Sequence, residues 1–356
     1  MSPVLPAPRL LATDSVPALR WGVIGTGIAG RFVAALHAHT TQRAVAVAAR
    51  DRGKTQAFAS EHGISTVHDR PAALIEDPEV DVVYIATPHP LHCDLALEAI
   101  VAGKHVLIEK PIAMSAGEAR AITDAGRTAG LLVMEAMWTR YLPQADIIRQ
   151  VLAEGRLGEV HLVRADFGFS MPFDPAHRMW NADLGGGALL DAGVYPISFV
   201  SSVLGAPTSV TATGAVTSTG VDARADLLMD TATGATAIAS TSMVTSMPIT
   251  ASILGDAGRL EVHSPFFGPS GVTMTIGSLG SEETATWRDD TFATLHEGLG
   301  YQASWFASYV AEGRVESPVH GHEETVSVMA TIDAARRQIA DADGLSGSGP
   351  DGPAYS

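Results

Sequence analysis

The stretch RWGVIGTGIAG, residues 20–30, joins a short apolar run to three glycines with the spacing GxGxxG. A short apolar run predicts a buried strand, and the residues after it have helical periodicity. In that context Gly25 permits a tight turn, Gly27 lets the backbone approach a pyrophosphate, and Gly30 lets helix and strand pack closely. The first N–H groups of the helix then hold the phosphates at its positive dipole end. We predict a dinucleotide site built from Gly25, Thr26, Gly27, Ile28, Ala29 and Gly30; a glycine-rich structural turn is the alternative.

Strands and helices alternate regularly between residues 19 and 137. Each expected strand is apolar on both faces, which is typical of a parallel sheet covered by helices on both sides. We expect strands at 20–24, 44–49, 80–86, 105–108 and 131–135, with helices at 28–38, 54–62, 91–102 and 115–129. The segment is therefore predicted to be a Rossmann domain with a doubly wound parallel sheet, giving an α/β fold.

The regular alternation of expected strands and helices ends after residue 137. A helix over 142–153, a strand over 160–169 and a glycine-rich, helical stretch over 185–203 precede a long region, 208–276, rich in Thr, Val, Ser and Gly. Because Thr and Val suit a pleated surface, we expect an α+β domain at 138–343 with a large, open, mainly antiparallel sheet. Its last helices are expected at 298–312 and 323–340. Residues 1–18 are predicted to be a flexible leader and residues 344–356 a flexible tail.

Composition narrows the class of protein. The chain has 356 residues, which favours two domains, and 46% hydrophobic with 17% charged residues indicate a folded globular protein. Its net charge of −16 disfavours nucleic acid and anionic membranes as partners. No apolar run was expected to reach the roughly 20 residues that span a bilayer, and no secretory signal is evident, so a cytoplasmic location is expected. The single cysteine, Cys93, excludes an intrachain disulfide.

A cation stands where dinucleotide sites that use NAD often have an acid. At the end of the second expected strand, an acid usually holds the ribose 2′-hydroxyl, and this chain has Arg50 there. A guanidinium can bind a 2′-phosphate through two hydrogen bonds, and Lys54 lies one turn further on. NADP is therefore the predicted cofactor. NAD is the alternative, because a shift of one residue would place Asp51 at this point.

Two further segments end strands on the same edge of the predicted sheet. Thr87, Pro88 and His89 follow the strand at 80–86 and are expected to contact the nicotinamide side of the cofactor, with His92 one turn on. The two histidines lack a cluster of other ligands, so no metal is expected. Glu109 and Lys110 end the strand at 105–108, where Lys110 would face the nicotinamide. The alternative is a surface ion pair between these two residues.

The run GGGALLDAGVYP, residues 185–196, carries a candidate acid–base pair. Asp191 and Tyr195 are four residues apart and share one face of a helix. Removing a hydroxyl proton from an alcohol needs a base, and the tyrosine pKa near 10 would fall beside a lysine ammonium. We predict that Lys110 and Tyr195 are catalytic and that Asp191 orients the substrate or the lysine. A buried structural tyrosine beside the kink at Pro196 is the alternative.

Together these segments resemble the glucose–fructose oxidoreductase/inositol dehydrogenase (Gfo/Idh/MocA) superfamily. They are most similar to its dimeric dihydrodiol dehydrogenase and NADP-dependent xylose dehydrogenase branch. The resemblance covers about residues 20–340 and is carried by segments 25–30, 49–51, 109–111, 134–143, 165–169 and 184–196. A departure is His89, where many relatives have asparagine.

The resemblance implies roles for individual residues. Lys110 and Tyr195 match the catalytic lysine and the tyrosine proton donor, and Asp191 matches an aspartate of the substrate pocket. Arg50 and Lys54 match positions that grip the 2′-phosphate. Trp138, Arg140 and Phe167 match positions lining the pocket, and Trp180 lies in a stretch that varies between branches and shapes substrate choice. A homodimer formed through the exposed sheet face of the second domain is also implied.

The predicted function is an NADP-preferring hydride transfer between nicotinamide and a CH–OH or C=O group of a sugar, polyol or trans-dihydrodiol. Reduction of a keto-sugar or another carbonyl is the alternative physiological direction, because one active site serves both directions. A non-catalytic dinucleotide sensor on the same scaffold is the alternative of a different class.

Overall fold

The computed structural model describes residues 3–346, which form two compact units. Leu10–Leu142 and Thr291–Thr325 make up the parallel-sheet unit. The residues up to Arg9, Pro143–Asp290 and the residues from Val326 onward make up the antiparallel-sheet unit. Each unit is described by itself below.

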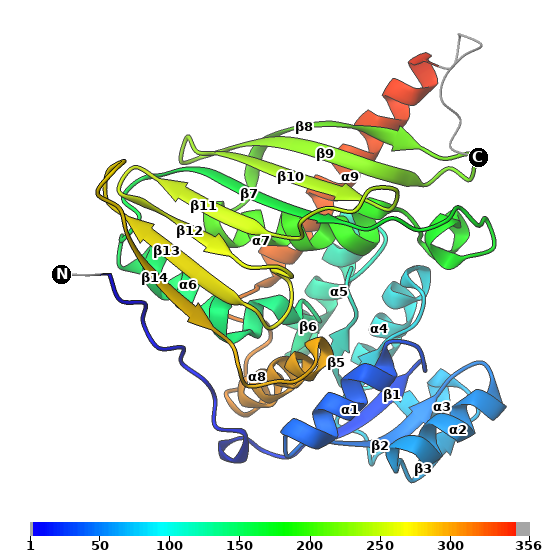
Figure 1. Ribbon diagram of the computed structural model, residues 1–356. Helices are drawn as coiled ribbons and strands as arrows, with labels where there is room; N and C mark the ends of the chain where they lie inside the picture. Colours follow the sequence, from blue (N-terminus) through cyan, green and yellow to red (C-terminus); the bar gives the residue numbers. More distant parts are fainter. Residues whose placement is uncertain (1–2, 347–356) are drawn as a thin grey trace. The chain divides into compact units, whose positions relative to one another are not determined.

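The parallel-sheet unit contains six strands in the order β3-β2-β1-β4-β5-β6, all paired in parallel (Figure 1). Their bounds are β1 Arg20–Ile24, β2 Arg43–Ala48, β3 Thr66–His68, β4 Val82–Ile85, β5 His105–Ile108 and β6 Val133–Glu135. The strand order reverses between β1 and β4, which is the switch point where ligands bind in such sheets. The predicted doubly wound parallel sheet is confirmed. The sequence did not predict β3, which is short and only partly buried.

Helices follow these strands, and some of them begin with a side-chain cap and end at a left-handed glycine. They are α1 Ala29–His39, α2 Arg52–His62, α3 Pro71–Ile75, α4 His92–Val101 and α5 Ala116–Ala129, with short 3-10 turns η1 Thr13–Ser15, η2 His89–Leu91 and η3 Trp138–Tyr141. For example, the Ser115 side chain accepts a hydrogen bond from the N–H of Glu118 at the start of α5, and Gly130 ends that helix in the left-handed conformation.

A later segment of the chain completes this unit. It contains η7 Leu295–Gly298 and α8 Leu299–Ala311. The ring of Phe306 on α8 lies 5.2 Å from that of Trp21 on β1, and Phe32 on α1 lies 5.6 Å from the same indole. Because these rings are fully buried together, α8 belongs to the hydrophobic core around β1. The sequence boundary at 137/138 had grouped residues 291–325 with the second domain instead.

The antiparallel-sheet unit contains eight strands in the order β14-β13-β12-β11-β7-β10-β9-β8 (Figure 1). Their bounds are β7 Val160–Gly168, β8 Pro207–Val216, β9 Asp222–Thr231, β10 Thr236–Ser242, β11 Ala251–Gly255, β12 Gly258–Val262, β13 Gly271–Ile276 and β14 Glu283–Arg288. The pair β7–β10 is parallel and the other pairs are antiparallel. The predicted mainly antiparallel sheet is confirmed, with β14 lying beyond the predicted range.

Burial alternates along this sheet because one face packs on helices. On β9, Leu227 and Met229 are buried, whereas Leu228 is half-exposed. The helices of the unit are α6 Pro143–Ala153, α7 Val194–Leu204 and the part of α9 His322–Ser346 that follows Thr325, with short turns η4 Arg178–Trp180, η5 Ala182–Leu184 and the π-helical turn η6 Leu189–Gly193. Helix α7 packs on β7 and β10. The Gln338 side chain of α9 bonds the main chain of β8.

The two chain ends differ from simple flexible segments where the structure describes them. Residues 3–9 form no regular element, but they are bonded to the region of α6: the Arg9 guanidinium pairs with Asp146 at 3.1 Å, and the carbonyl oxygens of Ala7 and Val4 accept from Gln150 and Arg156. Helix α9 extends to Ser346, and the rest of the predicted tail, 347–356, lies outside the described residues.

Among the described residues, one helical stretch, Ala182–Leu204, is long and apolar enough to cross a membrane by length and composition alone. This differs from the expectation that no apolar run reaches such a length. However, 78% of its 18-residue window is buried inside the structure, a property shared with the core helices of soluble proteins. The observation is therefore weak evidence for a membrane span.

Candidate active site

The glycine turn after β1 has the geometry that the sequence predicted for Gly25. This residue has φ 109°, and its N–H donates to the carbonyl oxygen of Ala48 at 2.9 Å. A Cβ at Gly25 would lie 2.2 Å from the carbonyl oxygen of Ala86. Only glycine fits such a position, because the backbone is left-handed and a neighbouring main chain leaves no room.

The next two glycines differ from each other. A Cβ at Gly27 would meet no atom within 4 Å, so the main chain there faces open space at the start of α1. That open space fits the diphosphate of a dinucleotide, which the helix N-terminus would bind. A Cβ at Gly30 would meet Phe58 and His62 of α2 at ordinary contact distances. The close packing of helix on strand that was predicted for Gly30 is therefore not seen.

The charged residues that follow β2 differ in their side-chain contacts. Asp51 is the N-cap of α2, and its Oδ1 accepts a hydrogen bond from the N–H of Lys54 at 3.0 Å. The side chains of Arg50 and Lys54 are exposed. Arg52 forms an ion pair with Asp69 at 2.9 Å. Because Asp51 is engaged as a helix cap, Arg50 and Lys54 are the residues here that suit an anionic ligand.

The residues that were predicted to contact the nicotinamide lie at the carboxyl ends of β4 and β5. The Oγ1 atom of Thr87 is buried and has no hydrogen-bond partner among the described residues. Glu109 is buried, accepts a hydrogen bond from the Tyr84 hydroxyl at 2.5 Å and lies close to the N–H of Lys110. Burial raises the pKa of Glu109. Lys110 itself is partly exposed and precedes a cis bond to Pro111.

His92 has a different position from the one predicted for it. Its ring is fully buried, with Nδ1 3.0 Å from the carbonyl oxygen of Pro111 and Nε2 3.0 Å from that of Thr87. Burial lowers the pKa of His92, which favours the neutral ring. The ring therefore ties the loop after β4 to the turn after Lys110 rather than facing a cofactor. His89 is also buried, 5.6 Å from this ring, and Pro88, which directly precedes His89, is partly exposed.

A buried polar network lies behind the Lys110 turn. Glu135, at the end of β6, accepts from the N–H of Ile112 at 2.9 Å and lies 2.8 Å from Nε2 of His320. The Nδ1 atom of His320 lies 3.6 Å from Glu324. Burial lowers the pKa of His320, but hydrogen bonds to Glu135 and Glu324 outweigh it and raise the pKa overall. The network fixes the main chain directly after Lys110.

Arg140 belongs to this network as well. Its guanidinium binds both carboxylate oxygens of Glu324, at 2.8 and 3.1 Å, and donates to the carbonyl oxygen of Val319 at 2.7 Å. Burial alone would raise the pKa of Glu324, but His320 and Arg140 lower it to about 2. The guanidinium that was predicted to line the substrate pocket is thus engaged in an ion pair, and its contact with a substrate stays a prediction. Trp138, on the same turn η3, is buried as well.

The antiparallel-sheet unit brings together Asp191, Tyr195 and Phe167. Asp191 lies on the π-helical turn η6, and Tyr195 lies in the first turn of α7. The Tyr195 ring is 5.6 Å from Phe167 and 5.0 Å from Phe267, and those two phenylalanines stack at 4.4 Å. Asp191 is partly exposed and accepts from the Arg178 guanidinium at 3.0 Å. The predicted acid–base tyrosine therefore packs beside two phenylalanine rings, and Asp191 is engaged in an ion pair.

Sequence reasoning missed Arg178 and Phe267 and misplaced Trp180. Arg178 lies thirteen residues from Asp191, and Phe267 lies in the loop before β13, so no periodic pattern linked either to the site. Trp180 is fully buried, packs with Met179 and Met243, and donates to the carbonyl oxygen of Pro172 at 2.9 Å. It belongs to a hydrophobic cluster rather than to an open pocket wall.

Within residues 3–346, no group of three or more His, Cys, Asp or Glu side chains is arranged to hold a metal ion. The residues around the switch point of the parallel sheet fit a bound dinucleotide. The left-handed Gly25, the open space at Gly27 and the unpartnered Oγ1 of Thr87 all occur in one unit, around the switch point of the parallel sheet.

Comparison with known proteins matches two family models to successive parts of the chain. Residues 19–137 match the family described as an oxidoreductase family with an NAD-binding Rossmann fold, and residues 146–261 match the GFO/IDH/MocA C-terminal domain. A trans-1,2-dihydrobenzene-1,2-diol dehydrogenase from Xenopus laevis is 33% identical over 327 residues, covering 90% of this chain and 98% of the relative. Its counterpart from Danio rerio is 34% identical over 331 residues, covering 90% and 97%.

Solved structures show the same fold. A 3-ketoreductase from Actinomadura kijaniata, in complex with NADP and TDP-benzene, superposes with a TM-score of 0.79 at 30% identity, covering 91% of this chain and 98% of the other. A levoglucosan dehydrogenase in complex with NADH and levoglucosan has a TM-score of 0.83 at 22% identity, and this likeness concerns the fold alone.

Proposed function

The chain belongs to the Gfo/Idh/MocA family of NAD(P)-dependent oxidoreductases, and on that premise we propose an NADP-dependent hydride transfer catalysed by Lys110 and Tyr195. The reacting group is a CH–OH or C=O group of a sugar, polyol or trans-dihydrodiol. The observation that carries the proposal is the place of Lys110, directly after β5 and in the same unit as the glycine turn. The carboxyl edge of such a sheet is where bound nicotinamides lie.

The preference for NADP rests on the charges after β2. The Asp51 carboxylate faces the N–H of Lys54 as a helix cap, whereas the cations of Arg50 and Lys54 are exposed. A 2′-phosphate would therefore meet guanidinium and ammonium groups, which bind phosphate through charge-assisted hydrogen bonds. The ketoreductase relative, solved with NADP, supports the same choice.

The proposed proton transfer uses the Tyr195 hydroxyl. A bound nicotinamide would take the hydride from the alcohol carbon in oxidation or return it to the carbonyl carbon in reduction. In the oxidising direction the Tyr195 phenolate takes the proton of the substrate hydroxyl as the carbonyl forms, and in the reducing direction the Tyr195 hydroxyl gives that proton back. The Lys110 ammonium favours the phenolate by electrostatics and lowers the pKa at which the base is available. Asp191, held by Arg178, orients the substrate hydroxyl.

The aromatic surface around Tyr195 favours a cyclic substrate. Phe167 and Phe267 stack with an interplanar angle of 12°, and they present flat apolar surface next to the tyrosine ring. Such a surface suits an unsaturated ring or the C–H face of a sugar. Dihydrodiol oxidation and keto-sugar reduction both fit this surface, and the relatives include a dihydrodiol dehydrogenase and a 3-ketoreductase.

We also propose that the chain forms a homodimer through the outer face of the eight-stranded sheet. On that face, Leu228 of β9 is half-exposed and lies opposite Ile238 of β10, so adjacent strands present apolar side chains there. Sedimentation equilibrium tests the assembly, and a wild-type chain that is monomeric at micromolar concentration would contradict it.

The experiment for the proposed reaction is absorbance at the reduced-nicotinamide band with a panel of sugars, polyols and dihydrodiols. The wild type should turn over at least one of them with NADP. Tyr195→Phe should lower kcat by about a hundred- to ten-thousandfold with little change in the Kd for NADP. A Tyr195→Phe enzyme with near-normal kcat would remove this tyrosine from the proton transfer, and no turnover of any substrate would favour a dinucleotide sensor.

A further inference from the structure

A buried carboxylate holds the turn that precedes Tyr195. Asp222 begins strand β9, is only 6% exposed, and accepts a hydrogen bond through Oδ2 from the N–H of Leu189 at 2.6 Å. Leu189 is the first residue of the π-helical turn η6, which carries Asp191 and continues directly into the helix of Tyr195. The carboxylate thus meets unsatisfied N–H groups at the start of this helical segment.

The glycine run before the turn is shaped around the same carboxylate. Gly187 has φ 114°, and a Cβ at this position would lie 2.5 Å from Oδ1 of Asp222. A Cβ at Gly186 would lie 2.5 Å from the carbonyl oxygen of Met179. Residue 187 must be glycine both for its backbone conformation and for the space that Asp222 occupies. This run belongs to segment 184–196, one of the segments that carry the resemblance to the family. The contact with Asp222 gives a physical reason for one of its glycines.

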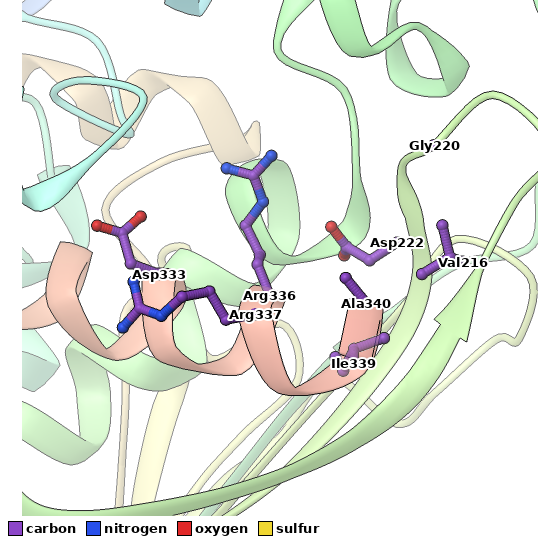
Figure 2. A pocket seen from close by; sticks show the side chains of 8 residues that line it. All are labelled: Val216, Gly220, Asp222, Asp333, Arg336, Arg337, Ile339 and Ala340. Carbon is purple, nitrogen blue, oxygen red and sulfur yellow. The ribbon is translucent and has the colours of Figure 1, made fainter. Parts of the chain in front are cut away.

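Asp222 also lines a pocket formed with helix α9. The pocket has a volume of about 320 Å³ and is lined by Asp222 together with Asp333, Arg336 and Arg337 of α9 (Figure 2). Figure 2 shows Asp222 and Arg336 on neighbouring segments of its wall. Burial raises the pKa of Asp222 to about 6, and the N–H of Leu189 and the Arg336 charge act against this rise. Asp222 is therefore mostly ionised at neutral pH and able to change its charge in mild acid.

A simple helix cap would not need such a residue. An exposed serine or threonine caps a helix without the cost of burying a charge. A buried carboxylate, by contrast, sets the direction of the bound N–H group through a strong charge-assisted bond. Its hydrogen bond to Leu189 reaches the π-helical turn that carries Asp191, and this contact links Asp222 to the site. Insertions of this π-helical type often occur at functional sites.

We propose that Asp222 is a positioning residue for the reaction. Ionised Asp222 fixes the start of the turn, and the turn in turn fixes the directions of Asp191 and Tyr195 toward the substrate. The proposal rests on the proposed function, because it assumes that Tyr195 transfers the proton.

The first test is Asp222→Asn, which keeps the size of the side chain but replaces one accepting oxygen with an N–H donor. We expect kcat to fall by about ten- to a hundredfold, since small misplacements of a reacting group have effects of this size. The Kd for NADP should stay within about twofold, because its proposed site lies in the other unit. Asp226→Asn is the matched control, a half-exposed aspartate of the same strand whose removal should leave kcat unchanged.

The pH profile separates positioning from a purely structural role. In the wild type, kcat should decline as the pH falls through about 6, where Asp222 takes up a proton. In Asp222→Asn this decline should be absent. Arg336→Met removes the cation that favours ionised Asp222, so the decline should move upward by at least about 0.3 pH unit. Asp333 and Arg337, the other charged groups of the pocket, remain in place in both variants.

The outcomes separate this proposal from the reaction that it assumes. Wild-type kcat in Asp222→Asn, with Tyr195→Phe inactive, would overturn the positioning role and leave the reaction standing. Near-normal kcat in Tyr195→Phe would instead overturn the reaction. If Asp222→Asn does not fold, Arg336→Met decides: an upward shift of the acid decline supports the proposal, and an unchanged decline overturns it.

Discussion

The glycine turn after β1 and the π-helical turn before α7 each hold a backbone segment of the proposed site at the start of a helix, but by different means. At the first turn, Gly25 is fixed by main-chain atoms of Ala48 and Ala86. At the second, Leu189 is fixed by the Asp222 side chain, which comes from 33 residues away. A turn that is fixed by main-chain contacts can be recognised from a short motif. For a turn that is fixed by a distant side chain, the sequence shows the glycines but not the residue that holds them.

The largest effect is expected at the main-chain turn. Gly25→Ala places a Cβ 2.2 Å from the Ala86 carbonyl oxygen at a φ of 109°. Since the backbone cannot yield cheaply, we expect a loss of at least about 3 kcal/mol in the free energy of unfolding and no measurable NADP binding. Urea denaturation and cofactor titration measure both.

Gly63→Ala is the control for backbone conformation alone. Gly63 also has a positive φ, of 67°, but a Cβ there would meet no atom within 4 Å. Its cost should be only about 1–2 kcal/mol, with NADP binding retained. Equal losses in the two variants would show that close approach to Ala86 does not matter, and the contrast between the two turns would weaken.

The network behind Lys110 tests whether side chains also hold the parallel-sheet unit. The pKa of Glu324 lies at about 2, below its usual 4.5, so its contribution to stability is present above pH 4.5 and is lost as the pH falls toward 2. The shift corresponds to about 3 kcal/mol at most. Glu324→Gln should therefore unfold more easily at pH 7, and its stability should depend less on pH between 5 and 3.

Glu323→Gln, at the neighbouring position, provides the comparison. Glu323 is largely exposed and pairs with Arg120 at the surface, where ion pairs contribute little. Its unfolding curves should follow those of the wild type across the same pH range. If Glu324→Gln behaved in the same way, Arg140 and Glu324 would not form a stabilising buried pair, which would contradict this account of the network.

The smallest effect is expected at the adenosine end of the cofactor site. Arg50→Ala should raise the Kd for NADP by about tenfold or more and leave the Kd for NAD nearly unchanged, because the guanidinium is proposed to meet only the 2′-phosphate. Arg52→Ala is the matched control, since Arg52 already pairs with Asp69. Fluorescence titration of both cofactors gives the four constants, and an equal loss for NADP and NAD in Arg50→Ala contradicts the assignment.

The fold could be predicted from the sequence because its signals are local. The apolar runs of β1, β4 and β5 and the glycines after β1 lie within short windows, and each appears where it was expected. Strand β3 was missed because it has three residues and none of them is fully buried. The membership of α8 in the parallel-sheet unit was missed because it depends on contacts such as Phe306 with Trp21, far apart in the sequence.

The site was harder to predict from the sequence, because its contacts join residues that are far apart in the chain. Sequence reasoning selected Lys110, Asp191 and Tyr195 from motifs, but the partners of the selected residues come from distant segments. Arg140 was predicted to contact the substrate and His92 the cofactor. The sequence did not indicate the hydrogen bonds of Arg140 to Glu324 and of His92 to main-chain carbonyls. Trp180 read as a pocket wall, although its indole is fully buried in a cluster with Met179 and Met243. Residue type alone does not reveal whether a polar or aromatic side chain faces a ligand or the interior.

The most direct test of the central claim, that Lys110 and Tyr195 act on one proton, is a double-mutant cycle on kcat with Lys110→Met, Tyr195→Phe and the double variant. Residues that act as a unit show non-additive losses. The account predicts that the double variant loses little more activity than Tyr195→Phe alone. Losses that multiply would mean that the two side chains act independently, and would contradict it.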